Sequence, residues 1–379
     1  MKHLRQEKAW LLALSFALSN LCMAEDDFTL VGLLKDDEAL NYPHDVELQG
    51  DIAYVPGKGG SLAIIDVSDV TKPKLLSSLF GMEGMEDAET VLPMGDILLV
   101  GTRGFLAVDV SDPSKPKIVK RITDRPRIDK INGMALRGKH VFTANKSGYV
   151  GVFDVSNPAA PILKEVLDTK NFGGLDTPHD IAAFGDHIIV VNADHYGPTN
   201  VIVYRVADPE SHELLPVKQW VIESSITDTK KLSENLGGAN RVAVTGSYAG
   251  VGAFVRDWVG IIDLSNPKKI KRIANLPVAD IDATGMTAVG QVLFVAGGEA
   301  VEAIDISDPA MPVSIAQYRA GKLFPTRRLM QRKTPRFDNA HDLVYRDGYI
   351  FVTAQNDNQF GILKVNDARV LELVEKKMK

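Results

Sequence analysis

Short runs of apolar residues follow one another along the chain, and each run ends at glycine, proline, aspartate or asparagine. LAIIDV (62–67), FLAVDV (105–110) and VGVFDV (150–155) are typical of these runs. Short segments rich in Val, Ile, Leu and Phe between such breaks predict β-strands. After residue 24, no long segment has the apolar period of an amphipathic helix. The pattern therefore predicts an all-β protein.

The strand pattern repeats seven times. Each copy contains one strand before a glycine turn, one after it, a third strand beyond a loop, and a fourth after a turn of the Ser-Asp-Pro kind. The seven turn glycines are Gly50, Gly95, Gly138, Gly185, Gly246, Gly290 and Gly348. Four-stranded units spaced roughly 45 residues apart are typical of propeller blades. We predict a seven-bladed β-propeller of four-stranded antiparallel blades, built as one domain from residues 25–379.

The third strand and the turn after it carry a family resemblance. LAIIDVSDVTKP (62–73) and its variants in the other copies resemble the LVIVD repeat. Members of that family are regarded as β-propellers of exported or surface proteins. The resemblance implies a fold and an extracytoplasmic setting, but it implies no particular activity.

Two segments compete to close the ring between the last blade and the first. FTLVGLL (28–34) has the pattern of an outermost strand that precedes the first blade. RVLELVE (369–375) fits the fourth strand of the last blade equally well. We expect one of them to complete the ring and the other to form an extra edge strand.

The first 24 residues predict an export signal. Basic residues precede the apolar stretch WLLALSFAL (10–18), and small residues lead to a cleavage site after Ala24. The chain is therefore expected to be periplasmic or secreted. A lipid anchor on Cys22 is disfavoured, because Ser19-Asn20-Leu21 is a poor match to the residues that precede lipidated cysteines.

Composition and charge argue against some classes of partner and ligand. The net charge of −6 and the pI of about 5.8 argue against nucleic acid as a partner. The single cysteine, Cys22, lies in the predicted signal, so the mature chain has neither a disulfide nor a thiolate ligand. We expect a monomer with no transmembrane segment after cleavage.

One polar position recurs in every blade, and we call it the column. It lies six residues before the turn glycine, or seven in the last copy, and comprises His44, Glu89, Asn132, His179, Asn240, Thr284 and His341. Aspartate follows each histidine, at Asp45, Asp180 and Asp342. Because the first strand of a blade lines the channel, the column should surround one mouth of it.

Three interpretations of the column remain open. In the first, His44, His179 and His341 bind a transition-metal ion (Zn, Cu, Mn or Fe), with Glu89 as a possible fourth ligand. In the second, the His-Asp pairs form hydrogen bonds with backbone groups around the ring. In the third, the ring of polar side chains binds an organic or anionic ligand without a metal.

Loops on the same face are expected to form a second polar tier above the column. The loops between second and third strands include Lys58, Lys146 and Gln355, and two long insertions occupy 223–240 and 319–340. The second insertion is rich in arginine and lysine, which suits a lid for an anionic ligand. The candidate ligand-binding residues at the mouth are Glu89, Asn132, Asn240, Arg103, His195, Arg256, Arg327 and Arg328.

These patterns predict a binding protein. We expect an exported β-propeller that binds a small molecule or a protein partner through its channel-mouth face. The alternative is a metal-dependent periplasmic enzyme with a three-histidine site in the central channel. No catalytic residue can be assigned from the sequence.

Overall fold

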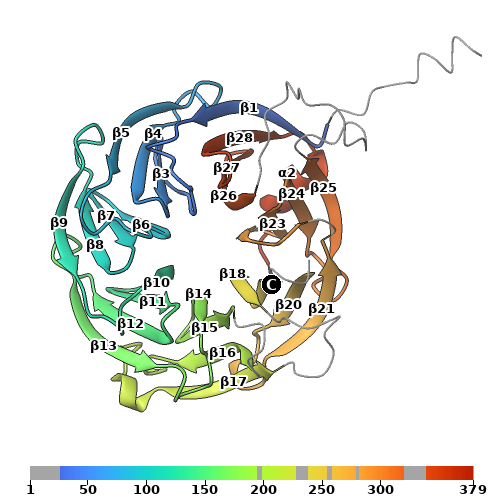
Figure 1. Cartoon of the computed structure of the whole chain (residues 1–379). Coiled ribbons are helices and arrows are strands. Elements are labelled where there is room, and N and C mark those ends of the chain that lie inside the picture. The colour runs from blue at the N-terminus through green and yellow to red at the C-terminus, as the bar shows by residue number, and fades with distance from the viewer. Residues whose placement is uncertain are drawn as a thin grey trace, which may run out of the picture.

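The computed structural model describes residues 26–193, 199–227, 238–253, 258–278, 281–319 and 339–378. Within these ranges, strands form seven four-stranded antiparallel sheets that follow one another around a ring (Figure 1). The predicted seven-bladed β-propeller is therefore confirmed. The export signal predicted for residues 1–24 lies outside the described residues. No helix among the described residues is long and apolar enough to cross a membrane.

The first three blades follow one another in chain order, from the innermost strand outward. The first comprises β2 (Glu47–Gln49), β3 (Ile52–Gly57), β4 (Ser61–Asp66) and β5 (Lys74–Phe80). The second comprises β6 (Thr90–Met94), β7 (Ile97–Gly101), β8 (Phe105–Asp109) and β9 (Lys117–Ile122). The third comprises β10 (Ile131–Arg137), β11 (His140–Asn145), β12 (Tyr149–Asp154) and β13 (Ile162–Asp168).

The next three blades keep this order. The fourth comprises β14 (Pro178–Phe184), β15 (His187–Asn192), β16 (Thr199–Arg205) and β17 (Val221–Thr227), with the 3₁₀ helix η1 (Val217–Gln219) before β17. The fifth comprises β18 (Ala239–Thr245), β19 (Tyr248–Ala253), β20 (Trp258–Asp263) and β21 (Lys271–Pro277), with η2 (Pro267–Lys269) before β21. The sixth comprises β22 (Gly285–Val289), β23 (Val292–Gly297), β24 (Ala300–Asp305) and β25 (Val313–Arg319).

The seventh blade joins the two ends of the chain. Its inner strands are β26 (Ala340–Arg346), β27 (Tyr349–Ala354) and β28 (Gln359–Val365), and its outermost strand is β1 (Phe28–Lys35). β1 pairs with β28 in antiparallel register from Phe28 opposite Val365 to Lys35 opposite Gln359. The segment 28–34 is thus the one that closes the ring. The pairing covers the edge that β28 would otherwise expose.

The other candidate for closure was wrongly predicted as a strand. Residues of that segment form the helix α2 (Ala368–Val374), which lies against the sixth blade. Asp367 caps this helix by accepting a hydrogen bond from the Val370 N–H. Its apolar residues 370, 371, 373 and 374 recur with the spacing of a helix face rather than in alternation. Val370, Leu373 and Val374 are buried, so packing stabilises the helix.

The apolar core lies between neighbouring blades. The second and third strands, such as β3 and β4, are buried on both faces, whereas most residues of the outermost strands β5 and β9 are exposed or half-buried. Between the first two blades, for example, Tyr54 and Leu62 share a cluster with Leu98. The turns between third and fourth strands are stabilised by their aspartates, as where the Asp66 carboxylate accepts from the Ser68 N–H.

Four of the innermost strands share an irregularity near the mouth of the ring. Each of β10, β14, β18 and β26 changes register against its second strand within its first few residues. The residues that lie at these shifts are Asn132, His179, Asn240 and His341. A bulge takes a residue out of the ladder and redirects its side chain and carbonyl. In these four blades, the column residue is therefore presented by distorted backbone at the inner edge of the sheet.

A candidate ligand site at the channel mouth

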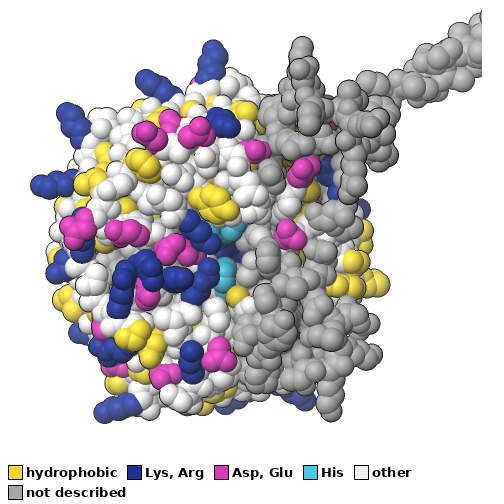
Figure 2. Space-filling model, viewed as in Figure 1, with side chains coloured by type: hydrophobic (Ala, Val, Ile, Leu, Met, Phe, Trp, Pro, Cys, Tyr) yellow, Lys and Arg dark blue, Asp and Glu magenta, His cyan; other side chains and the backbone are white. Residues whose placement is uncertain are grey.

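A cavity of about 340 Å³ lies at the mouth of the ring. Its lining includes His44, His179, Asn240, Thr284 and His341 from the column. Lys58, Lys146 and Gln355 reach it from the loops between second and third strands. Figure 2 shows histidine side chains near the centre of this face, beside lysine and arginine. We call this space the channel-mouth cavity.

Each column histidine donates a hydrogen bond to the next blade around the ring. The Nδ1 atoms of His44, His179 and His341 lie 2.8, 2.9 and 2.7 Å from the backbone oxygens of Glu89, Asn240 and His44, respectively. A carbonyl oxygen only accepts hydrogen bonds, so each Nδ1 carries the hydrogen. Each neutral ring therefore keeps an unprotonated Nε2 that can accept a hydrogen bond or bind a metal.

In the first and fourth blades, the aspartate after the histidine makes a second contact with the next blade. The Oδ2 atoms of Asp45 and Asp180 accept from the N–H groups of Val91 and Val242 in the next blade, both at 2.9 Å. Each of these N–H groups lies two residues beyond the column residue of that blade. The innermost strand is a sheet edge with unpaired backbone groups. The His-Asp pairs satisfy these groups and join successive blades.

Burial keeps the column histidines neutral. Desolvation lowers the pKa of His44, His179 and His341 well below the ordinary value, and nearby cations lower it further. The Nε2 atom of His44 lies 3.5 Å from the Glu89 carboxylate. We do not assign an ion pair there, because the neutral ring has no hydrogen on Nε2. The rings of His44 and His341 are in contact, with centroids 3.9 Å apart.

Two lysines converge on the carboxylate of Glu89. Lys146 Nζ lies 3.1 Å and Lys58 Nζ 3.6 Å from its Oε2 atom. The Glu89 side chain is 3% exposed, so these charges meet in a poorly solvated place. Burial lowers the pKa of Lys146 to about 8, although the attraction of Glu89 opposes that shift. At neutral pH, two cations face one anion, which leaves a net positive charge beside the cavity.

Several polar atoms around the column are buried without a hydrogen-bond partner. These atoms include His44 Nε2, Asn132 Oδ1, Asn240 Oδ1 and Gln355 Nε2. His179 differs, because the amide of Asn132 lies 3.1 Å from its Nε2 atom and donates to it. Buried polar groups normally have partners. The unpaired atoms are hydrogen-bonding positions that a bound ligand can fill.

A charged cluster lies deeper in the ring. The buried Arg241 lies 3.4 Å from Asp342, and the charges of Asp342, Asp180 and Asp45 all favour its protonated form. Burial raises the pKa of Asp180 and Asp342. A smaller cavity, of about 180 Å³, is lined by these four residues among others. The attraction of Arg241 for these carboxylates joins the inner edges of the first, fourth, fifth and seventh blades.

The remaining candidates for ligand binding are dispersed. Arg103 forms ion pairs with Asp129 at 3.1 Å and with Asp87 at 3.8 Å, and it does not line the channel-mouth cavity. Glu89 and Asn132 do not line the cavity, but each contacts a residue that does. Glu89 contacts Lys146, and Asn132 contacts His179. Candidates outside the described residues are His195, Arg256, Arg327 and Arg328. Most of the two insertions also lies outside them.

Arg241 was not among the site residues predicted from the sequence. It follows Asn240 in the column, so it occupies the position that holds aspartate in the three His-Asp blades. The fifth blade has no column histidine and carries a positive charge where the three His-Asp blades carry aspartate. That reversal of charge could have identified Arg241 from the sequence. Lys58, Lys146 and Gln355 were expected in the second polar tier, but their sequence did not show which of the loop residues reach the column.

The contacts of the column residues bear on the predicted metal site. Among residues with assigned positions, no group of three or more His, Cys, Asp or Glu side chains has an arrangement that could hold a metal ion. Glu89 is engaged by two lysines, and the Nε2 atom of His179 is engaged by Asn132. Of the three column histidines, His44 and His341 are those whose Nε2 atoms have no side-chain donor among the described residues and can accept from another ligand.

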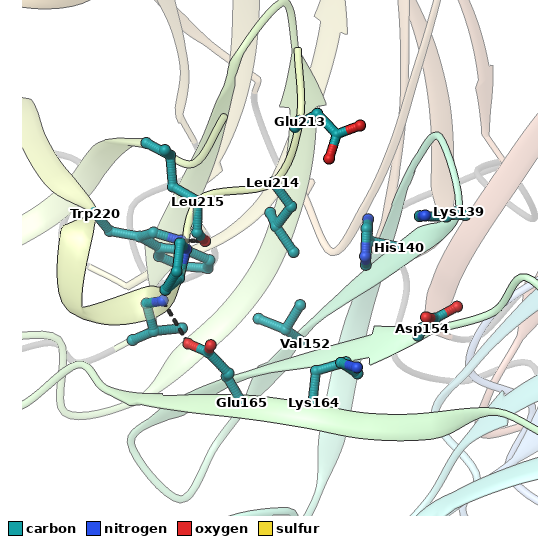
Figure 3. A pocket seen from close by; sticks show the side chains of 12 residues that line it. Lys139, His140, Val152, Asp154, Lys164, Glu165, Glu213, Leu214, Leu215 and Trp220 are labelled. Carbon is teal, nitrogen blue, oxygen red and sulfur yellow. Dashed lines mark hydrogen bonds between the residues drawn. The ribbon is translucent and has the colours of Figure 1, made fainter. Parts of the chain in front are cut away.

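A separate cavity of about 250 Å³ lies between the third and fourth blades. Figure 3 shows Trp220 and Val152 beside it, with charged residues of both signs on its walls. The Glu165 carboxylate accepts from the backbone N–H of Val217, and the indole of Trp220 donates to Leu215 O at 2.9 Å. These contacts hold the 213–220 loop against the third blade. The Glu165 carboxylate and the Trp220 indole are therefore already engaged within the protein.

The fold and the site together define a β-propeller with a polar channel-mouth cavity. The sequence profile of the LVIVD repeat matches residues 42–79, 87–124, 130–169, 236–271 and 282–320, which together amount to half of the chain. The chain belongs to the LVIVD repeat family. The matched segments correspond to the first, second, third, fifth and sixth blades.

Comparison with solved structures extends the agreement on fold. A chain in "Crystal Structure of Mitotic Checkpoint Complex" is similar, with a TM-score of 0.60 over 92% of this chain and 98% of that one. The two sequences are 12% identical, so the similarity concerns the fold alone. No curated protein matches the sequence.

Proposed function

We propose that this protein binds a small organic anion in the channel-mouth cavity. The observation that carries the proposal is the convergence of Lys58 and Lys146 on the single carboxylate of Glu89. One positive charge is left over in a place where burial weakens solvent screening. A bound anion would neutralise that charge, and a poorly solvated ion pair is stronger than an exposed one.

The cavity also has the size and composition of a small-molecule site. Its volume of about 340 Å³ falls in the range of ligand pockets, whereas a lone ion would need far less space. Its hydrogen-bonding groups come from rigid strands and from loops of different blades. This arrangement places them on a fixed frame, which limits the entropy lost when a ligand binds. Export through residues 1–24 is part of the proposal, and it would expose the cavity to ligands outside the cytoplasm.

Calorimetric titration with monocarboxylates tests the proposal. Acetate, hexanoate and benzoate should be compared with the uncharged acetamide at constant ionic strength. We expect a carboxylate to bind, and we expect Lys146→Met to weaken that binding at least tenfold. Lys115→Met is the matched control, since Lys115 is 81% exposed on a turn between third and fourth strands. Equal affinities for both variants, or no binding of any carboxylate, would overturn the proposal.

A transition metal remains the second candidate ligand, and an enzyme activity would depend on it. The observation in its favour is the contact between His44 and His341, each with Nδ1 bound to a backbone oxygen and Nε2 left unprotonated. The positive charges of Lys58 and Lys146 beside them oppose a cation. Elemental analysis of protein purified without chelator decides between the two, since stoichiometric metal that is lost in His44→Asn would favour the metal.

A further inference from the structure

We infer that the bound anion is a hydroxylated carboxylic acid. This inference rests on the proposed function and adds the class of ligand. The cavity combines an excess positive charge with several uncharged hydrogen-bond acceptors, and a carboxylate that carries hydroxyl groups matches both.

The hydrogen bonds of the column histidines determine which of their ring atoms can accept from a ligand. Because the Nδ1 atoms of His44 and His341 donate to backbone oxygens, their Nε2 atoms accept. The two rings are 3.9 Å apart, so these acceptors are neighbours. The unpaired Asn240 Oδ1 is a third acceptor from the blade across the ring. Adjacent hydroxyl groups on one ligand can donate to neighbouring acceptors at the same time.

The charges favour hydroxyl donors over an ammonium group. Lys58, Lys146 and Arg241 all lower the pKa of the column histidines, which shows that a further positive charge is disfavoured there. An amino acid would place its ammonium in that same field. A hydroxyl group donates hydrogen bonds without adding charge. The carboxylate of the ligand would meet Lys58 and Lys146, and Gln355 Nε2 offers one more donor to it.

Matched six-carbon ligands test this class. D-gluconate carries a carboxylate and hydroxyl groups, hexanoate carries only the carboxylate, sorbitol only the hydroxyl groups, and norleucine a carboxylate with an ammonium. We expect gluconate to bind at least tenfold more tightly than each of the other three, because each lacks one of the matched groups or adds charge. If gluconate and hexanoate bind equally, the inference fails while anion binding stands. If no carboxylate binds, both fail.

Paired substitutions at His44 locate the hydroxyl contact. In His44→Asn, the side-chain amide can still donate to Glu89 O from the place of Nδ1, while the acceptor at Nε2 is removed. Asparagine already occupies the column at Asn132 and Asn240, so the fold accommodates it there. We expect this variant to retain its melting temperature within a few degrees and to lose the preference for gluconate over hexanoate. An unchanged preference in the folded variant would overturn the assignment of the acceptor.

A substitution at a second column histidine separates the loss of a ligand contact from an effect of His44→Asn on folding. His341→Asn makes the same exchange in the seventh blade, where Nδ1 donates to His44 O. It should reduce the gluconate preference in the same direction. His140→Asn is the control, since His140 begins β11 far from the column and lines the cavity between the third and fourth blades. A loss of preference in the control as large as in His341→Asn would contradict the inference.

Discussion

The Nδ1 hydrogen of His341 is donated to the backbone oxygen of His44 over 2.7 Å, and this bond joins the last blade to the first. The same relationship joins His44 to Glu89 and His179 to Asn240. It explains why the chain repeats histidine followed by aspartate, since each pair satisfies backbone groups at the inner edge of the next blade. The same bonds leave the Nε2 atoms of His44 and His341 unprotonated, so the proposed ligand site would share these side chains with the contacts between blades.

Removing the bond between His341 and His44 should weaken ring closure. We expect His341→Ala to lower the free energy of unfolding by about 1–3 kcal/mol, because it leaves a buried carbonyl oxygen without its donor. His341→Asn should recover much of the loss, because its amide can replace the donor. Urea denaturation measures both variants, with His140→Ala as the control outside the column. A loss in His341→Ala no larger than that of the control would refute this role.

The neutral column histidines should make stability depend on pH. In the unfolded chain, His179 takes up a proton near its ordinary pKa of about 6.5, whereas burial lowers its pKa in the folded state. Keeping His179 neutral in the folded state therefore costs no free energy above about pH 6.5. The free energy of unfolding decreases as the pH falls below that value. Between pH 7.5 and 5.5, the wild type should lose about 1 kcal/mol more than His179→Asn.

Buried carboxylates contribute the opposite slope and must be separated from this effect. The pKa of Glu47 is raised to about 8, and that of Asp342 is raised as well, so both favour the folded state less as the pH rises. Glu47 and Asp342 are present in both the wild type and His179→Asn, so their contributions to the pH dependence of stability largely cancel when the two proteins are compared. Parallel stability curves for the wild type and His179→Asn, measured by thermal denaturation across this range, would show that His179 is not kept neutral by the fold.

The contact between Gly290 and helix α2 gives a third prediction. Gly290 and Gly138 both have a φ of +56°, so alanine is strained at either turn. At Gly290 a Cβ atom would also lie 2.4 Å from Val374 O, whereas at Gly138 nothing lies within 4 Å. Gly290→Ala should therefore destabilise the protein by roughly 1–3 kcal/mol more than Gly138→Ala. Equal losses in chemical denaturation would mean that α2 does not pack on this turn.

Closure by β1 predicts a strong effect of truncation. A chain that begins at residue 36 lacks β1 and exposes the long edge of β28. We expect it to aggregate or to pair with another copy, since unpaired edges promote association. A chain that begins at residue 26 keeps the strand and is the control. Size-exclusion chromatography compares them, and a monomeric, cooperatively folding short chain would show that β1 is dispensable.

The architecture was predictable because the apolar runs and their turns recur with a regular period. The fourth and seventh blades lie outside the segments matched by the LVIVD profile, yet they keep the same strand order. In the fourth blade the loop 206–220 replaces the usual turn, and in the seventh the outermost strand comes from the other end of the chain. Residues 369–375 were misassigned because so short a segment fits a strand or a helix, and packing on Gly290 and the sixth blade decided the outcome.

The site was less predictable than the fold. Placement of the column at the inner edge followed from the blade pattern, but the hydrogen-bond partners of His44, His179 and His341 are backbone atoms of other blades. Every residue has a backbone carbonyl group, so a sequence does not indicate which one accepts a hydrogen bond. The approach of Lys58 and Lys146 to Glu89 depends on the curvature of the ring, which brings together three separate blades. A periodic pattern specifies each blade, but not which loop side chains meet at the centre.

The pKa of Lys146, with and without a bound carboxylate, is the most direct test of the central claim. It can be followed by ¹³C NMR of the lysine side chains, with Lys146→Arg used for assignment, in acetate and in chloride at equal ionic strength. We predict a pKa of about 8 in chloride, because burial disfavours the charged amine, and a clear rise in acetate, because a bound anion favours it. A Lys146 pKa that is the same in both salts would contradict anion binding at the channel mouth.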